Sequence, residues 1–462
     1  MPNGLHRIGN ISTSIDYRTD DVLVPGAEIV TTRSILVGQN QTNVDPKAAI
    51  LLGAVCEMTT AKSRMNWGVW LDAEFPHVIL IVGKRGSGKS YDLGIIAEAL
   101  CAPKDSAISR GTERFAMILF DTQSQFWTLA EIGHLGEEQK GLLNHWDIPA
   151  DAIIQPTIYR PKGTPKIGGN EVEFALRPGD LSSADWAALC ELEQFSAMGQ
   201  CLYKARAVMP DGFSLQEMID WLQSDEAADE HGENTRLAVK WRLEAQLSTN
   251  LFDETAEDIC TRLGTVGAKG VIQLADLEEA VKAVIVAVIM RKLISWAGPA
   301  QRRRKMALMR GEEIQITDDE VAPRIWTLID EAHLICPSQG HTAARPVVVD
   351  YVKRGRDAGL SLVLATQQPS AIDNDAISQS DIVVIHKLTI DPDINAATAR
   401  MPAPGPRAVQ KGQTGSNIGD MGAVTRTLDG GQSLFADAES NRAFIMRSRP
   451  RVTPHGGGEP TL

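Results

Sequence analysis

Short apolar runs alternate with longer stretches of helical periodicity along most of this 462-residue chain. Runs of the kind found in buried strands occur at residues 78–82, 115–120, 270–274, 325–329, 360–365 and 381–387. Buried strands that are separated by helices are typical of a mostly parallel, doubly wound sheet. The pattern therefore predicts an α/β protein with such a sheet at its core.

The pattern changes between residues 181 and 268, where strand-like runs stop. Residues 183–204, 214–224 and 235–248 have helical periodicity and few glycines. Ser182 or Ser183, and Ser214, stand where N-caps are expected. We predict a helical insertion here, followed by a long buried helix at 277–296.

The remaining segments are shorter or more irregular. The N-terminal region has strand-like pieces at 21–24 and 34–37 and a helix-like run at 46–59. Residues 309–322 are acidic and polar, which is typical of a surface loop. The predicted division is a short N-terminal region (1–75), a first part of the α/β core (76–180), the helical insertion (181–268), a second part of the core (269–400), and a Gly/Pro-rich segment with a C-terminal tail (401–462).

Composition narrows the class of protein. The chain is 43% hydrophobic and 23% charged, and its net charge of -13 argues against a protein that coats nucleic acid with its outer surface. Basic clusters at 302–305, 353–356 and 447–451 are either solvated faces or the walls of a local channel. Six unpaired cysteines, no signal peptide and no membrane span predict a cytoplasmic protein with reduced thiols.

The most informative motif is GKRGSGKS at residues 83–90, which matches G-x-x-x-x-G-K-[ST]. It lies between a predicted strand and a predicted helix, as a phosphate-binding loop requires. A glycine-rich turn that matched the motif by chance would not be expected in this context. In such a loop the backbone N–H groups and the lysine hold phosphates, and the serine ligates Mg²⁺. The motif predicts ATP and Mg²⁺ as ligands of Gly83, Arg85, Gly86, Ser87, Gly88, Lys89, Ser90 and Tyr91.

A second motif supplies acids. The strand at 325–329 runs directly into Asp330 and Glu331. We expect Asp330 to hold Mg²⁺ together with Ser90, and Glu331 to polarise the attacking water. His333 either couples the site to a neighbouring element or packs as a cap. Gln367 follows the strand at 360–365 and is the first candidate for a γ-phosphate sensor, with Gln368 second.

The string Asp-Glu-Ala-His at 330–333 invites comparison with two-lobed helicases, but the spacing disagrees. Lys89 and Asp330 are farther apart than one compact helicase lobe needs, and residues 370–462 are too few for a second lobe. A single motor lobe must receive its catalytic arginine from a neighbouring subunit. We therefore expect a ring.

Taken together, the motifs resemble the HerA branch of the HerA/FtsK motors. The resemblance lies in GKRGSGKS after His77, in the DEAH box, in GRDAGLSLVLATQQPSAID, in SQSDIVVIHKLT, and in the closing RSRPRVTPHGG. It implies a RecA-like P-loop NTPase core in a hexamer that threads duplex DNA and works with a nuclease or other effector. It also implies Arg356 as an arginine finger acting in trans, with Arg354 as the second candidate.

The sequence departs from the family pattern at its N-terminal region, and it leaves two alternative functions open. Family members usually begin with a larger β-barrel, which is expected here to be reduced, replaced or absent. The first alternative is a nucleotide-dependent scaffold that assembles and activates an effector in anti-phage defence. The second is a conjugation or secretion motor, which ranks last because no membrane segment supports it.

Overall fold

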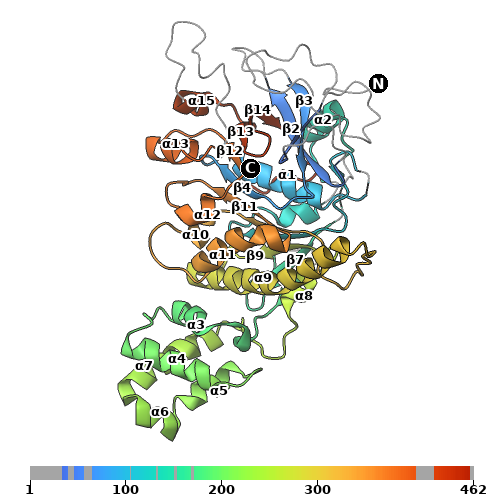
Figure 1. Cartoon of the computed structure of the whole chain (residues 1–462). Coiled ribbons are helices and arrows are strands. Elements are labelled where there is room, and N and C mark those ends of the chain that lie inside the picture. The colour runs from blue at the N-terminus through green and yellow to red at the C-terminus, as the bar shows by residue number, and fades with distance from the viewer. Residues whose placement is uncertain are drawn as a thin grey trace.

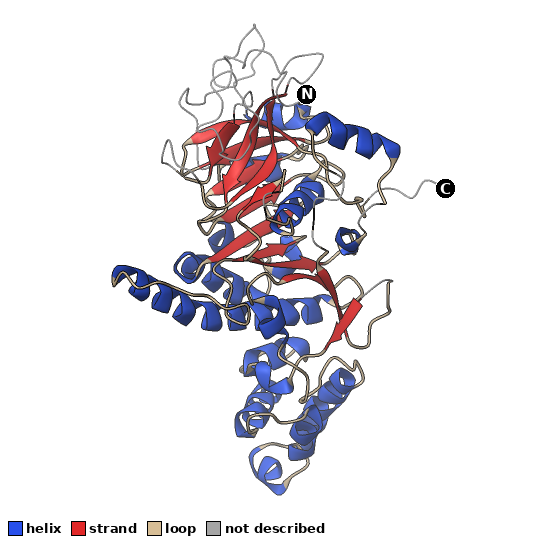
Figure 2. Cartoon of the chain, turned by 90° about the vertical axis from the view of Figure 1, so that its right-hand side faces the viewer, coloured by secondary structure: helices blue, strands red, loops and turns tan. Residues whose placement is uncertain are grey.

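The structure is a computed structural model that describes residues 34–39, 46–56, 65–104, 106–131, 134–149, 153, 155–167, 171–401 and 421–457. Within these residues fourteen strands form one large sheet (Figures 1 and 2). The strands are β1 (Ser34–Val37), β2 (Ala49–Cys56), β3 (Met65–Asp72), β4 (Val78–Val82), β5 (Ser109–Arg110), β6 (Ala116–Asp121), β7 (Thr157–Pro161), β8 (Glu171–Phe174), β9 (Lys269–Gln273), β10 (Ile325–Ile329), β11 (Leu360–Thr366), β12 (Ile382–Ile385), β13 (Gln432–Asp437) and β14 (Arg442–Ser448).

The sheet has a parallel half and a mostly antiparallel half. Its order is β1-β3-β2-β14-β13-β12-β4-β11-β10-β6-β9-β7-β8, with β5 beside β2. From β12 to β8 all neighbours are parallel. Strand β11 lies between β4 and β10, so the ends of these three strands meet at one edge. The predicted α/β fold with a RecA-like core is confirmed.

Helices cover both faces of this sheet. They are α1 (Lys89–Leu100), α2 (Glu137–Trp146), α3 (Ser183–Leu189), α4 (Ala197–Val208), α5 (Leu215–Trp221), α6 (Asp225–Glu230), α7 (Glu233–Leu247), α8 (Ile259–Leu263), α9 (Glu279–Met309), α10 (Ala332–Ile335), α11 (Ala344–Ala358), α12 (Asn374–Ile377), α13 (Asp391–Thr398) and α15 (Met421–Thr427), with short 3₁₀ turns at Trp127–Ala130 and Pro178–Asp180.

Alternation along the strands divides the interior into two cores. In β4, Leu80 and Val82 pack in the core beneath α9 and α11, whereas Ile79 and Ile81 pack in the core beneath α1. Because both faces are covered, the parallel strands are apolar throughout, which is why their sequences show continuous apolar runs. Helices α3 to α7 lie at one end of the molecule (Figure 1). The buried apolar residues of α3, α4, α5 and α7 belong to the same core as those of α9 and α11.

Several sequence expectations can be checked directly. The six predicted buried strands correspond to β4, β6, β9, β10, β11 and β12. Ser182 and Ser214 form capping boxes with Asp185 and Glu217. The predicted helix at 183–204 is two helices, α3 and α4, because Ser196 caps a new helix after an intervening turn.

The helix expected at 46–59 is wrong. Its central residues form β2, which is buried between β3 and β14. A fully buried strand lacks the polar alternation that would have separated it from a helix. Gly53 explains the tight packing, since a Cβ there would lie 2.2 Å from the carbonyl oxygen of Arg447.

The remaining expectations concern the Gly/Pro-rich and N-terminal segments, the cysteines and membrane spans. The predicted strand at 21–24 and residues 402–420 of the Gly/Pro-rich segment lie outside the described residues. The five cysteines whose side chains are described are buried and unpaired, as expected. In the described part of the chain no helix, α9 included, has an apolar stretch long enough to cross a bilayer.

Candidate active site

The glycine loop connects β4 to α1 as its motif predicts. Helix α1 begins at Lys89, directly after Gly88. Gly86 and Gly88 have φ angles of 74° and 116°, which favour glycine because an added Cβ would be strained there. The loop is closed by the N–H of Ser87, which donates to the carbonyl oxygen of Lys84 at 3.1 Å. A Cβ placed on Gly86 would meet open space, since nothing beyond its chain neighbours lies within 4 Å.

The two acids at the end of β10 lie against the start of α1. Lys89 Nζ donates to Glu331 Oε1 at 2.8 Å, and Ser90 Oγ donates to Asp330 Oδ1 at 3.5 Å. All four side chains are buried. Parallel strands bring these groups together, since the carboxyl ends of β4 and β10 share one edge of the sheet with only β11 between them.

Glu331 adopts an unusual backbone conformation. Its φ of 46° and ψ of 51° lie in the left-handed region, which costs free energy for a residue with a side chain. Strain of this kind is concentrated at functional sites, where the surrounding structure holds it in place. Here it turns the carboxylate toward Lys89, while Asp330 remains fully buried at the strand end.

Polar side chains from β11 and α10 complete the cluster. Gln367 Nε2 donates a hydrogen bond to Glu331 Oε1. Gln368 is exposed, and its backbone N–H donates to Thr366 Oγ1 at 3.1 Å. His333 Nδ1 lies 3.1 Å from the same Thr366 hydroxyl and 3.5 Å from Glu331 Oε2. Burial lowers the pKa of His333, which favours its neutral form. The first-choice amide, Gln367, is therefore the one in contact with the acid.

The electrostatics of this cluster suit a cation and phosphates. Burial raises the pKa of Asp330 to about 7, and nearby Lys89 partly opposes that shift. Asp330 Oδ2 and Glu331 Oε2 are buried and have no hydrogen-bond partner among the described residues. Carboxylate and hydroxyl oxygens are ligands that Mg²⁺ prefers. Asp330 and Ser90 could hold that ion, and the open glycine loop fits the phosphates it would accompany.

A cavity of about 980 Å³ opens in front of the loop. It is large enough for a nucleoside triphosphate, whose phosphates would lie at the Lys89 end. Apolar and aromatic groups from α2 form another part of its wall. The lining consists of Lys84, Arg85, Gly86, Ser87, Gly88, Lys89, Ser90, Tyr91, Gln123, Gln125, Leu142, Trp146, Glu331, Gln367, Gly431, Arg447, Ser448, Arg449, Pro450, His455 and Gly457.

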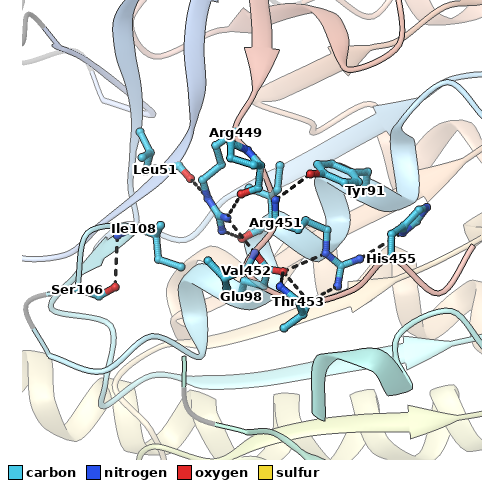
Figure 3. A network of polar contacts seen from close by, with 12 residues as sticks. Leu51, Tyr91, Glu98, Ser106, Ile108, Arg449, Arg451, Val452, Thr453 and His455 are labelled. Atoms are coloured by element: carbon cyan, nitrogen blue, oxygen red, sulfur yellow. Dashed lines mark hydrogen bonds and ion pairs between the residues drawn. The ribbon is translucent and has the colours of Figure 1, made fainter. Parts of the chain in front are cut away.

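The C-terminal part of this lining comes from a segment, residues 447–457, that lies along α1 (Figure 3). Its Arg449 and Arg451 are fully buried and contact Glu98 of α1 at 2.9 and 3.0 Å. Thr453 Oγ1 also donates to Glu98, at 2.6 Å. The interpretation of 447–451 as a solvated basic cluster is therefore wrong for Arg449 and Arg451, whose charges are neutralised inside the protein.

The two candidate arginine fingers lie elsewhere. Arg356 is in the last turn of α11, is exposed, and lies 3.5 Å from Glu439. Arg354 is exposed as well and is paired with Asp350 one helical turn earlier. Helix α11 leads into the start of β11, the edge of the sheet opposite Lys89, so neither arginine lines the cavity of its own chain.

A glycine loop on a parallel sheet, a buried acid pair, and an amide directly after the strand between them define a P-loop ATPase. The model of the family described as "Helicase HerA, central domain" matches residues 57–293, about half of the chain. This protein belongs to that family, as the sequence motifs predicted.

Two curated relatives match over shorter lengths. The DNA double-strand break repair helicase HerA of Sulfurisphaera tokodaii is 24% identical over 140 residues, which is 30% of this chain and 26% of the relative. A probable helicase, MJ1565, of Methanocaldococcus jannaschii is 26% identical over 118 residues, covering 26% and 20%. The matches thus span about a quarter of these relatives or less. Among solved structures, VirB4 of Thermoanaerobacter pseudethanolicus aligns with a TM-score of 0.48 and 13% identity, covering 89% of this chain and 96% of VirB4.

Proposed function

We propose that this protein is a HerA-type motor: a hexameric ring that hydrolyses ATP, binds duplex DNA, and translocates it in complex with a nuclease or other effector. The observation that carries the ATP hydrolysis in this proposal is the contact of Lys89 and Gln367 with one acid, Glu331. Phosphate-binding, water-activating and sensing groups are thereby held in a single hydrogen-bonded cluster. Family membership supports the same activity.

Each residue has a distinct role in this proposal. The glycine loop and Lys89 bind the β- and γ-phosphates, and Ser90 and Asp330 hold Mg²⁺, which neutralises charge on the phosphates when bound. Glu331 accepts a proton from the attacking water, and Gln367 positions that water by hydrogen bonding. When phosphate binds, Lys89 must leave its ion pair with Glu331. The Glu331 carboxylate is then free to contact the attacking water. The ion pair of 2.8 Å therefore represents the resting arrangement.

Duplex DNA binding is proposed for a local basic surface, because the net charge of -13 disfavours general contact. Arg302 and Arg303 are exposed near the end of α9, beside Lys305, which pairs with Asp357 at 3.1 Å. Lysine and arginine side chains that reach phosphates make binding depend on salt. We propose these three residues as contributors to the DNA channel.

The decisive measurement is ATP turnover of the purified oligomer with and without linear duplex DNA. We expect DNA to raise turnover several-fold, and reversal of Arg302, Arg303 and Lys305 to Glu to abolish the increase while basal turnover persists. Reversal of Lys162 and Arg262, two exposed cations paired with Asp253 and Glu257, serves as the control. Turnover of a correctly assembled ring that ignores DNA would reject the translocation proposal.

A second candidate is a nucleotide-dependent scaffold that activates an effector in anti-phage defence, which the acidic net charge favours. It predicts that Lys89→Ala abolishes the complex with the effector, whereas Glu331→Gln preserves it by retaining ATP. Pull-down of the effector with both variants tests this candidate. Equal assembly by the two variants would count against the scaffold.

A further inference from the structure

The three arginines of the RSRPR segment have different environments, although they are spaced two residues apart. Arg449 and Arg451 are fully buried, and both contact Glu98, as the dashed lines in Figure 3 show. Arg447 is only partly buried and lines the cavity that Lys89 also lines. Its side chain makes no hydrogen bond or ion pair with any described residue. Two arginines therefore anchor the segment, and the third keeps its charge available.

Strand β14 holds Arg447 beside the glycine loop through its neighbour Ser448. The N–H of Ser448 donates to the carbonyl oxygen of Gly431 at 2.9 Å, and its hydroxyl donates to Asp92 Oδ1. Asp92 lies in the first turn of α1, the helix that begins with Lys89. Its other oxygen lies 3.0 Å from His386 Nε2. The position of Arg447 is thus tied to the helix that supplies the phosphate-binding lysine.

The same contacts link β14 to the loop glycines. A Cβ placed on Gly88 would lie 3.7 Å from the backbone nitrogen of Gly431 and 3.2 Å from the His386 ring. Gly431 consequently lies between Gly88 and Ser448, so β14 ends next to the turn that cradles phosphate. This proximity involves a single chain and needs no neighbouring subunit.

The charges of the cavity favour an anion at Arg447. Lys89 is paired with Glu331, whereas Lys84 and Arg85 are exposed on the loop itself. A guanidinium that is partly desolvated and lacks a carboxylate partner gains most from an anionic ligand. Its planar set of donors matches two phosphate oxygens at once, which a lysine cannot do. The phosphates of the nucleotide are the anions that this cavity would hold.

We propose that Arg447 binds a phosphate of the nucleotide in cis, so that each chain supplies an arginine to its own site. This inference rests on the proposed ATPase function and adds a residue to it. The segment 447–457 then acts as a wall of the site that is anchored on α1 through Glu98 and Asp92.

Binding of ATPγS, ADP and inorganic tripolyphosphate to Arg447→Ala and Arg447→Lys tests the contact. We expect Arg447→Ala to weaken all three ligands at least 10-fold, with partial recovery in Arg447→Lys. Arg426→Ala is the matched control, since Arg426 pairs with Asp391 and does not line the cavity. Unchanged affinities would overturn the proposal. Weakened nucleotide binding with unchanged tripolyphosphate binding would also overturn it, because the contact would then be to base or ribose.

Mixed assemblies separate action in cis from action in trans. When Lys89→Ala and Arg447→Ala chains are combined, no site has both residues if Arg447 acts in cis, and turnover should stay at the level of the separate variants. Recovery of turnover would show that Arg447 reaches the site of a neighbour and would overturn the cis assignment. The binding experiments do not require hydrolysis, so a wild-type protein without ATPase activity would reject the proposed function while leaving the Arg447 contact testable. Thermal melting of each variant checks its folding.

Discussion

At the scale of single residues, Glu331 is the group of the chain's own site on which activation of the attacking water should depend. Glutamine keeps its shape and can still contact Lys89, but it cannot accept a proton from water. We expect Glu331→Gln to lower kcat by about 10²-fold or more while nucleotide affinity stays within a few-fold. Single-turnover hydrolysis and equilibrium binding measure these two effects. Glu312→Gln, a change of an exposed acid in a loop, is the control. Hydrolysis at the normal rate by Glu331→Gln would contradict its role.

The site residues that could be predicted follow buried strands, whereas those that pair with distant segments could not be predicted. Gly83 to Ser90 and Asp330-Glu331 follow directly after buried strands, so their convergence could be deduced from the topology of a parallel sheet. Glu98 gave no such signal. It is an ordinary helix former in α1, and its partner Arg449 is 351 positions away. Ion pairs between distant segments leave no local pattern in a sequence.

At the scale of elements, the apolar strands β4, β6 and β9 to β12 were recognised, whereas buried β2 was taken for a helix and the more polar β7 and β8 were missed. Strands β7 and β8 contain TIYRP and EVEF, in which charged residues and a proline interrupt any apolar run. Arg160 of β7 pairs with Glu171 and Glu173 of β8 across the edge of the sheet. These strands depend on contacts with each other and with β9, which single-segment patterns do not reveal.

The pairing of α1 with the C-terminal segment should contribute strongly to stability. Glu98 is fully buried between two arginines, and Glu98→Gln leaves both guanidinium groups without their shared anion. We expect the free energy of unfolding to fall by about 3–5 kcal/mol, as found when one partner of a buried ion pair is removed. Urea denaturation measures the change, and Glu138→Gln on the exposed face of α2 is the control. A loss equal to that of the control would show that the pairs contribute little.

At the scale of the whole molecule, the site faces one edge of the sheet and Arg356 lies near the other. If subunits stack head to tail in a ring, an exposed arginine at that second edge can reach the site of a neighbour. We expect Arg356→Ala to lower turnover about 10³-fold or more, and mixing with Lys89→Ala chains to restore part of it.

Lys353→Ala is the matched control for this experiment, because Lys353 is an exposed cation of α11 paired at 3.7 Å with Asp375. Turnover assays over a range of mixing ratios give the result. An Arg356→Ala protein that hydrolyses ATP like the wild type, or that gains nothing on mixing, would direct attention to Arg354.

The distance in sequence between α1 and the segment that covers it has a consequence for synthesis. A ribosome adds roughly 5–20 residues per second, so Arg449 emerges roughly 20–70 s after Glu98. During that interval the nascent chain already contains the whole glycine loop but lacks the wall of its cavity and the cations that neutralise Glu98. The cavity around the glycine loop therefore becomes complete only after residues 447–457 have emerged and packed along α1.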